Sequence, residues 1–499
     1  MTVSVVMAIA ALTGWGALPR ISYAQDQGWS RPVPISPQGQ FGWFPDVAVD
    51  VTGQIHVVWA SGNTRYDTVM YTTSRDGQAW SAINDIAAFP QVAGSEASRP
   101  GIYIDRHDLI HMTFRSTTVY YSRAPTASAF SAGAWGRPQP VSGAQVAYFS
   151  RVARDGQGIL HLIFSENVSS TSCPICYHIF YRRSEDDGLN WTPPVDISRL
   201  ATGSAKMQLV VDGQDNLHVV WEAGRGGSYG QLEDPTRVMY IASYDRGITW
   251  TSPGEMNTPD VRAKAVAIGL GREDQLVVAW LSLPEDRVYY QTSTSQGHSW
   301  SAPQPIPGVW GGWSLYPARL DDYAMATDSA GDVHLICVCR TAENQSSLSV
   351  LHLRWDGAGW SVPEAIMTLE GDVPEWPRIS VGRGNELHVV WYVRDQKHIW
   401  GESPDGSAPE FQIWYARGVT SAPMVEATAM PLPTSTSEPQ VAAQTTPTAP
   451  VEPTSVPDLT SISAPSYSES DGVILLLQSL IPAALLIGII MIGTRLWRR

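Results

Sequence analysis

Eight side chains in this sequence are of types that recognise sugars or acidic ligands, and they stand where recurring segments of the chain begin or end. They are Asp46, Arg99, Arg151, Glu222, Asp322, Glu375, Trp376 and Arg378. Aromatic rings offer flat faces for stacking, and arginine offers forked donors to hydroxyl or carboxylate oxygens. Trp43, Trp310, Trp313 and Tyr316 lie in loops of the same kind. We interpret these residues as candidates for ligand binding, with packing inside the fold as the alternative for each one.

Six histidines recur at one equivalent position, and they are His56, His111, His161, His218, His334 and His388. Val277 takes this position in one further segment. Each histidine belongs to a separate structural unit, so the six rings cannot converge on one ion. We therefore predict packing roles for them and no metal site. No motif indicates a cofactor.

Two cysteines have the spacing of a metal or redox pair, Cys173-Pro-Ile-Cys176, but no second pair stands nearby in the sequence. Outside the cytoplasm, a local disulfide that tightens this loop is favoured over zinc. Cys337 and Cys339 share one face of an expected strand, and we interpret them as packing residues.

The histidines belong to an internal repeat of about 55 residues. The phrase appears as His56-Val-Val-Trp59, His218-Val-Val-Trp221 and His388-Val-Val-Trp391, and weaker versions stand between them. A tight turn precedes each copy, and two further short strands follow it. Four strands per repeat is the content of a propeller blade, so the sequence predicts an all-β, seven-bladed β-propeller over residues 25–418.

The seventh repeat ends without its last strand, and the missing piece stands at the other end of the chain. Trp29-Ser-Arg-Pro-Val-Pro-Ile35 matches Trp300-Ser-Ala-Pro-Gln-Pro-Ile306 and Trp360-Ser-Val-Pro-Glu-Ala-Ile366. We therefore expect the N-terminal strand to pair with the strand around Trp414 and to close the ring, which leaves few open sheet edges.

The turn before the last tryptophan of two repeats has the complete Asp-box pattern. The residues are Ser184, Asp186, Gly188 and Trp191 in one repeat and Ser243, Asp245, Gly247 and Trp250 in the next. Serine and aspartate satisfy backbone groups of a tight turn, and glycine adopts a conformation that other residues avoid. The chain resembles the sialidase-like (Asp-box) β-propeller superfamily over roughly residues 28–418. This resemblance implies that the Asp-boxes are structural and lie on the face away from the ligand.

The resemblance is incomplete at the positions that would make a sialidase. Members with that activity hold the substrate carboxylate with three arginines, and they use a Tyr–Glu nucleophile pair with an aspartate acid/base. The first of their arginines opens the first blade in an Arg-Ile-Pro phrase, where this chain has Trp43-Phe44-Pro45. Such members usually have six blades rather than seven. Arg99, Arg151 and Arg378 could form a substitute cluster, and no Tyr–Glu pair can be assigned.

Both ends of the chain have the composition of membrane-related segments. Residues 1–24 are expected to be a signal peptide, with an uncleaved anchor as the alternative. Residues 419–471 are rich in Pro, Ser and Thr and are expected to form an extended or disordered linker. Residues 472–494 are uncharged, apolar and long enough to span a bilayer, and the cytoplasmic tail is then 495–499. This topology predicts a single-pass protein of the cell membrane whose propeller is outside the cytoplasm.

The formal net charge of −15 argues against nucleic acid as a partner. The expected partner is an extracellular glycan or protein ligand. We call the face opposite the Asp-boxes the open-loop face, and we expect the ligand to bind there. The alternative function is an exo-acting glycoside hydrolase of the sialidase type.

Overall fold

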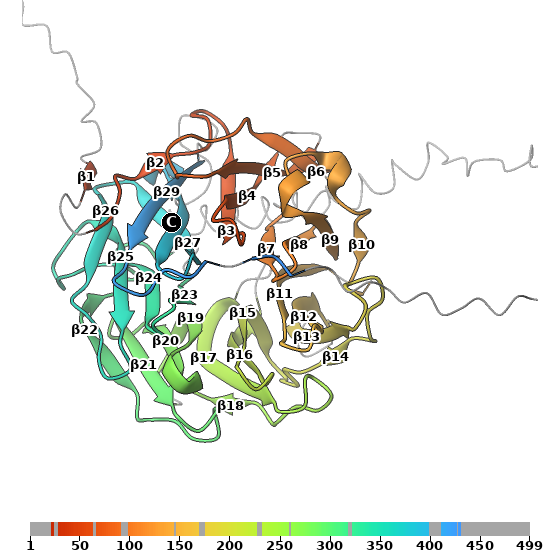
Figure 1. Cartoon of the computed structure of the whole chain (residues 1–499). Helices are drawn as coiled ribbons and strands as arrows, with labels where there is room; N and C mark the ends of the chain where they lie inside the picture. Colours follow the sequence, from red (N-terminus) through yellow and green to blue (C-terminus); the bar gives the residue numbers. More distant parts are fainter. Residues whose placement is uncertain are drawn as a thin grey trace, which may run out of the picture. The chain divides into compact units, whose positions relative to one another are not determined.

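The computed structural model describes residues 21–23, 28–62, 66–90, 98–143, 146–168, 175–226, 232–258, 261–317, 322–398, 411–426 and 428–430. Within them the strands form seven antiparallel sheets arranged as blades around a central channel (Figure 1). The expectation of an all-β propeller with seven blades is confirmed. Among the described residues, no helix is long and apolar enough to cross a bilayer.

Each blade runs from an inner strand at the channel to an outer strand at the rim. The first blade comprises β3 (Gly42–Val49), β4 (Ile55–Gly62), β5 (Tyr66–Ser74) and β6 (Asn84–Pro90). The second comprises β7 (Gly101–Ile104), β8 (Leu109–Arg115), β9 (Val119–Pro125) and β10 (Gln139–Pro140). The third comprises β11 (Ala147–Arg154), β12 (Leu160–Asn167), β13 (Tyr177–Ser184) and β14 (Val195–Asp196).

The fourth blade comprises β15 (Gly203–Val211), β16 (Leu217–Gly226), β17 (Leu232–Ser243) and β18 (Gly254–Glu255). The fifth comprises β19 (Ala263–Leu270), β20 (Leu276–Ser282), β21 (Arg287–Ser293) and β22 (Gln304–Trp310). The sixth comprises β23 (Ala324–Thr327), β24 (Val333–Cys339), β25 (Leu348–Trp355) and β26 (Glu364–Leu369). Short 3-10 helices lie at η1 (Thr126–Ser128), η2 (Ala132–Ala134), η4 (Arg272–Asp274) and η5 (Gln396–His398).

The seventh blade is built from both ends of the propeller. It contains β27 (Val373–Gly382), β28 (Glu386–Arg394) and β29 (Phe411–Val419), and β2 (Val33–Pro34) supplies its outer strand. Val33 pairs with Tyr415 and Pro34 with Trp414, which confirms the expected ring closure. A further strand, β1 (Ile21–Tyr23), pairs with β26, although its residues were expected to belong to the signal peptide.

Buried histidines in six blades orient the tyrosines or, in the sixth blade, the histidine that face the neighbouring blade. His161 Nδ1 lies 2.8 Å from the hydroxyl oxygen of Tyr181, and its Nε2 lies 3.2 Å from Asp155 Oδ2. The Trp250 ring of the following blade packs edge-on against Tyr181 with the ring centroids 4.9 Å apart. The same Asp–His–Tyr arrangement recurs around His56, His111 and His218. These histidines therefore hold the interfaces between blades.

The Asp-box turns are closed by their own side chains. In the third blade the Gly188 N–H donates to Ser184 Oγ (2.8 Å), and the Asn190 N–H donates to Asp186 Oδ1 (2.8 Å). Gly188 has a φ of 82°, and a Cβ there would lie 2.3 Å from the Tyr121 ring. The turn in the fourth blade repeats this pattern with Ser243, Asp245 and Gly247. Both turns therefore fix a close approach between neighbouring blades.

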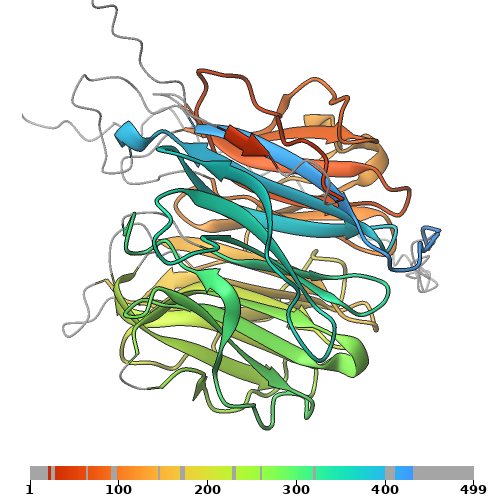
Figure 2. The ribbon, with the colours of Figure 1, turned by 90° about the vertical axis from the view of Figure 1, so that its left-hand side faces the viewer.

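Residues 420–426 and 428–430, which we call the strap, leave β29 and cross the ring on the Asp-box face (Figures 1 and 2). The Val425 N–H donates to the Arg383 carbonyl (2.8 Å), and the Met430 N–H donates to the Arg106 carbonyl (2.8 Å). The Thr420 hydroxyl donates to Asp328 Oδ2 (3.2 Å). The expected linker therefore begins as chain that is bound to the propeller. Its remainder, the expected membrane span and the cytoplasmic tail lie outside the described residues.

Candidate functional site

Four of the eight sequence candidates converge near the channel axis, although they come from four different blades. Arg378 Nη2 donates to Asp322 Oδ2 (2.6 Å), which pairs the seventh blade with the sixth. Asp46 accepts the Ile102 N–H at Oδ2 (2.9 Å) and the Val47 N–H at Oδ1 (3.0 Å). Burial raises the pKa of Asp46, and the charges of Arg151 and Arg378 oppose that rise. The cluster therefore holds two positive charges and two carboxylates close together.

Arg151 is the least satisfied member of this axial cluster. The one hydrogen bond described for its guanidinium goes to the Ser150 carbonyl, at 2.9 Å from Nη1. Burial and the neighbouring charge of Arg378 lower the pKa of Arg151 to about 10. Gly101 leaves room beside it, because a Cβ there would lie 3.5 Å from Arg151 Nη1 and 3.6 Å from Asp46 Oδ2.

Two further candidates, Arg99 and Trp376, lie in a plug that closes the channel towards the open-loop face. The Arg99 guanidinium lies 4.8 Å from the ring centre of Phe44 and 4.7 Å from that of Phe149. Trp376 packs edge-on against Phe44 (4.9 Å) and stacks with Phe149 of the third blade (5.7 Å). All four side chains are buried. Such cation–π and ring contacts make the plug a closed layer.

The backbone explains how these bulky side chains reach the axis. Phe44, Arg99 and Trp376 have φ values of 50°, 42° and 54°, which are uncommon for residues other than glycine. In β3 and β27 the register of the pairing shifts at this point, as it does at a β-bulge. A bulge bends the strand and redirects a side chain, so the residue at the start of the inner strand can turn into the channel.

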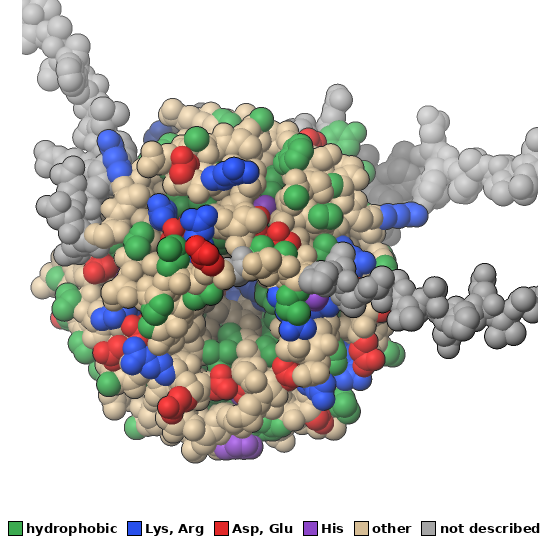
Figure 3. Space-filling model, in the orientation of Figure 1, with side chains coloured by type: hydrophobic (Ala, Val, Ile, Leu, Met, Phe, Trp, Pro, Cys, Tyr) green, Lys and Arg blue, Asp and Glu red, His purple; other side chains and the backbone are tan. Residues whose placement is uncertain are grey.

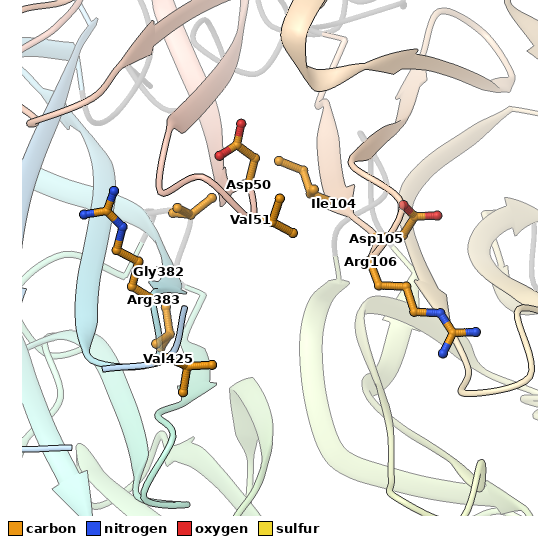
Figure 4. Close-up of a pocket in the computed structure, with 11 residues that line it drawn as sticks. Asp50, Val51, Ile104, Asp105, Arg106, Gly382, Arg383 and Val425 are labelled. Carbon is orange, nitrogen blue, oxygen red and sulfur yellow. The ribbon is translucent and has the colours of Figure 1, made fainter. Parts of the chain in front are cut away.

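Beyond the plug the channel opens towards the Asp-box face. Inner-strand residues past this level, including Arg151, Ala153, Val210 and Ser380, are partly exposed. The space-filling view of this face shows a hollow at the centre of the ring (Figure 3). At its mouth is a cavity of about 240 Å³, between the strap and blades one, two and seven, whose polar lining includes Asp50, Asp105, Arg106 and Arg383 (Figure 4). The channel is therefore a well that is closed at the plug.

The last two candidates are carboxylates with partners of their own. Glu222 Oε1 accepts the Ala265 N–H (2.6 Å) and lies 3.8 Å from Lys206 Nζ, and burial raises the pKa of Glu222. Glu375 Oε2 accepts hydrogen bonds from the Tyr392 hydroxyl (2.5 Å) and from Arg394 Nη2 (2.6 Å). Burial and the charge of Glu375 raise the pKa of Tyr392 far above its usual value. This Tyr–Glu pair could not be assigned from the sequence.

A separate cluster, which we call the Trp310–Trp313 cluster, lies on the open-loop face between blades five and six. The Arg287 guanidinium lies 4.6 Å from the Trp310 ring centre, and Lys264 Nζ lies 4.8 Å from that of Trp313. Asp286 fixes the loop, since its Oδ1 accepts the Trp313 N–H (2.9 Å). Both tryptophans are partly exposed. The sequence indicated these aromatic rings but not the cations beside them.

The cysteine pair and the question of metal ions fall partly outside the described structure. Cys173 lies outside the described residues, so the disulfide to Cys176 stays a prediction. Cys176 itself is buried, with its Sγ 3.9 Å from His178 Nε2. In the described ranges, no group of three or more His, Cys, Asp or Glu side chains is arranged to hold a metal ion.

Seven antiparallel blades around one axis, two of them with a complete Asp-box at the same turn, decide the fold. It is a seven-bladed β-propeller. No family model and no curated protein matches this sequence. Among solved structures, a PL25 ulvan lyase aligns with a TM-score of 0.51 and 11% identity, over 75% of this chain and 95% of the lyase. At that identity, the likeness to the lyase concerns the fold alone.

Two further similar structures align less well. A protein of unknown function from Dyadobacter fermentans gives a TM-score of 0.47 and 11% identity, over 79% of this chain and 100% of that protein. A NanB sialidase variant from Streptococcus pneumoniae gives a TM-score of 0.44 and 11% identity, over 77% of this chain and 70% of that enzyme.

Proposed function

We propose that this protein is a cell-surface, sialidase-like propeller that binds a glycan on its open-loop face. In this proposal residues 1–24 direct export, residues 472–494 hold the chain in the cell membrane, and a short cytoplasmic tail follows. The support for this placement is the composition of the two ends. The support for a glycan is the chemistry of the open-loop face.

The observation that carries the proposal is the Trp310–Trp313 cluster. Two partly exposed indole rings stand in this cluster, with the partly exposed Arg287 beside Trp310 and the buried Lys264 beside Trp313, and the Asp286–Arg340 ion pair (2.7 Å) holds the loop between them. Indole faces stack on the apolar faces of sugar rings, and the guanidinium of Arg287 suits hydroxyl or carboxylate groups. By contrast, Arg99, Asp322, Glu375, Trp376 and Arg378 are buried, so ligand contact by those candidates stays a prediction.

A glycan array probed with the full chain tests this function. Trp313→Ala should weaken binding roughly tenfold or more, since loss of a stacked ring removes on the order of 1.4 kcal/mol. Phe130→Ala is the matched control, because Phe130 is an exposed aromatic residue (53%) in the segment that replaces the Asp-box turn of the second blade. Equal binding by both variants, or no glycan bound by the parent chain, would contradict the proposal.

The alternative, an exo-acting glycoside hydrolase of the sialidase type, is favoured by the Tyr392–Glu375 hydrogen bond. Both residues are buried, and a phenol with a raised pKa keeps its proton, so catalysis would require exposure and activation of this pair. Turnover of a fluorogenic sialoside by the full chain, abolished in Tyr392→Phe, would support this function and displace the first. Glycan binding without turnover would support the binding protein.

A further inference from the structure

The junction between blades six and seven differs from the other blade interfaces at one residue. Tyrosine occupies the equivalent position opposite the second strand in six blades, at Tyr71, Tyr121, Tyr181, Tyr240, Tyr290 and Tyr415. In the sixth blade His352 stands there, opposite Ile336. The N-terminal Trp29 packs edge-on against His352 at 5.1 Å, as Asp-box tryptophans pack against the tyrosines elsewhere. This substitution therefore lies where the chain closes the ring.

His352 extends the usual Asp–His pair into a longer chain of contacts. His334 Nε2 lies 3.2 Å from Asp328 Oδ2, and His334 Nδ1 lies 2.9 Å from His352 Nε2. His352 Nδ1 in turn lies 2.9 Å from Glu364 Oε2. The two carboxylates at the ends of this series of contacts also accept hydrogen bonds from the segments that meet where the ring closes. Trp29 Nε1 donates to Glu364 Oε2 (3.2 Å), and the strap residue Thr420 donates to Asp328 Oδ2 (3.2 Å).

The two carboxylates at the ends of this series of contacts determine how many hydrogens the rings of His334 and His352 must carry. Hydrogen bonds lower the pKa of both Asp328 and Glu364, so each carboxylate is ionised and accepts. Each end therefore needs a ring N–H, and the contact between the two rings needs one more. That makes three protons on four ring nitrogens, whereas two neutral imidazoles carry only two. A neutral pair would leave one of the three contacts without a hydrogen.

The groups around the pair act in both directions. The Glu364 carboxylate favours a positive charge on His352, and Asp328 favours one on His334, while the guanidinium of Arg354 opposes a charge on His352. Burial is the largest of these effects, and together with His334 and Arg354 it lowers the pKa of His352 overall. The N-terminal segment presents the Trp29 ring, and the strap presents Thr420, around a cavity of about 260 Å³. Among the described residues, Asp328 and Glu364 are the only carboxylates in contact with either ring, and the nearby Asp332 is already paired with Arg354 (2.9 Å), so a second positive charge gains no new carboxylate partner.

We propose that the junction of blades six and seven is a proton-binding site that controls ring closure. One proton shared by His334 and His352 completes the hydrogen-bond chain that links Glu364 and Trp29 to Asp328 and the strap. A second proton places two N–H groups against each other at the 2.9 Å contact and opens the junction. The interfaces where a tyrosine faces the histidine lack this response, because the tyrosine hydroxyl can donate to a neutral ring, and the fifth blade has Val277 in place of the histidine.

Imidazole ¹⁵N spectra of the histidine-labelled full chain at about pH 7 count these protons directly. Three of the four ring nitrogens of His334 and His352 should carry hydrogen, and Glu364→Gln should reduce the count to two. His161 and His218, whose partners are tyrosines, serve as internal controls with one hydrogen each. A count of two or four on the parent pair would overturn the proposal.

Hydrogen exchange tests the effect on closure. Lowering the pH to about 4 should speed amide exchange in residues 28–36 and 411–421, once the rates are corrected for intrinsic exchange. The increase should be much larger than in the same segments of the His352→Tyr variant. That variant restores the residue found in the other blades. Glu364→Gln provides a second comparison, because it removes the carboxylate that favours the first proton. Equal acid responses in the parent chain and the His352→Tyr variant would refute the proposed proton-binding site.

Discussion

Gly247 lies where one blade touches the next, and its φ of 80° and the nearby Tyr181 hydroxyl both exclude a side chain. A Cβ at this position would lie 1.8 Å from the Tyr181 hydroxyl oxygen. The Asp-box glycine is thus required both by its own turn and by the tyrosine of the preceding blade. The sequence pattern revealed the first requirement, and only the folded ring reveals the second.

We expect Gly247→Ala to destabilise the protein by about 2–4 kcal/mol, the sum of a left-handed alanine and an overpacked contact. Gly357→Ala is the matched control, since Gly357 also has a positive φ (98°) but has no atom within 4 Å of an added Cβ. The free energy of unfolding of the Gly357→Ala variant should fall by only about 1 kcal/mol. Denaturant unfolding of the two variants measures the difference, and equal losses would show that the tyrosine contact is unimportant.

The buried Arg378–Asp322 pair makes a second prediction at this scale. Arg378→Met removes one partner of this pair and leaves the buried Asp322 carboxylate without its hydrogen-bonded guanidinium, so the protein should lose roughly 3–5 kcal/mol of stability. Adding Asp322→Leu to the same chain should recover much of that loss, because no unpaired charge remains. A double-mutant cycle by denaturant unfolding checks this, and additive losses would contradict the pairing.

At the scale of the element, the interface between blades is held by the repeated Asp–His–Tyr arrangement. The sequence indicated packing roles for these histidines, because they recur on separate blades, and the structure places them in contacts of this kind. It did not indicate the plug, since nothing in Phe44 or Trp376 marks a positive φ or a bulge. Nor did it indicate the strap, whose Pro, Ser and Thr residues are typical of free linkers. Both depend on contacts between distant parts of the chain.

These interfaces should make the fold less stable in acid. Hydrogen bonds from His218 and Asn216 lower the pKa of Asp212 to about 2. The contribution of Asp212 to folding stability is therefore fully present above its pKa in the unfolded chain, near 4, and is lost as the pH falls towards 2. Burial lowers the pKa of His111, so protonation of the unfolded chain already opposes folding below about 6.5.

Both effects have the same sign, and stability should therefore decrease steadily from about pH 7 to about pH 3. Thermal unfolding across this range measures it. His111→Gln should flatten the upper part of the curve, between about pH 6.5 and the lowered pKa, because its neutral amide does not titrate. A curve unchanged by the substitution would exclude His111 as a source of the acid response.

For the whole molecule, the decisive feature is that one blade is assembled from both ends of the propeller. The match between the Trp29 segment and the outer strands of other blades predicted this closure from the sequence alone. The Ile35 N–H donates to the Ile413 carbonyl (2.8 Å), and the Ser30 N–H donates to the Arg417 carbonyl (2.7 Å). Without these bonds β29 would present an open edge.

A chain lacking residues 28–36 should therefore associate through β29, as unpaired strand edges do. Sedimentation velocity at several concentrations should show a sedimentation coefficient that rises with concentration. A chain lacking only residues 1–20 is the control and should behave as the parent does. If the sedimentation coefficient of the chain lacking residues 28–36 does not depend on concentration, the edge of β29 must be covered by another part of the molecule.

The strap gives the propeller a particular response to mechanical load. Any tension applied to the chain beyond Met430 first reaches the bonds from Met430 to Arg106, from Val425 to Arg383 and from Thr420 to Asn385. These bonds are spread along the crossing, so they would break one after another, each rupture releasing a short length of chain. Only after the last one does the force reach β29. β29, on which the ring-closing strand β2 pairs, is therefore protected from a pull on the C-terminal side of the chain.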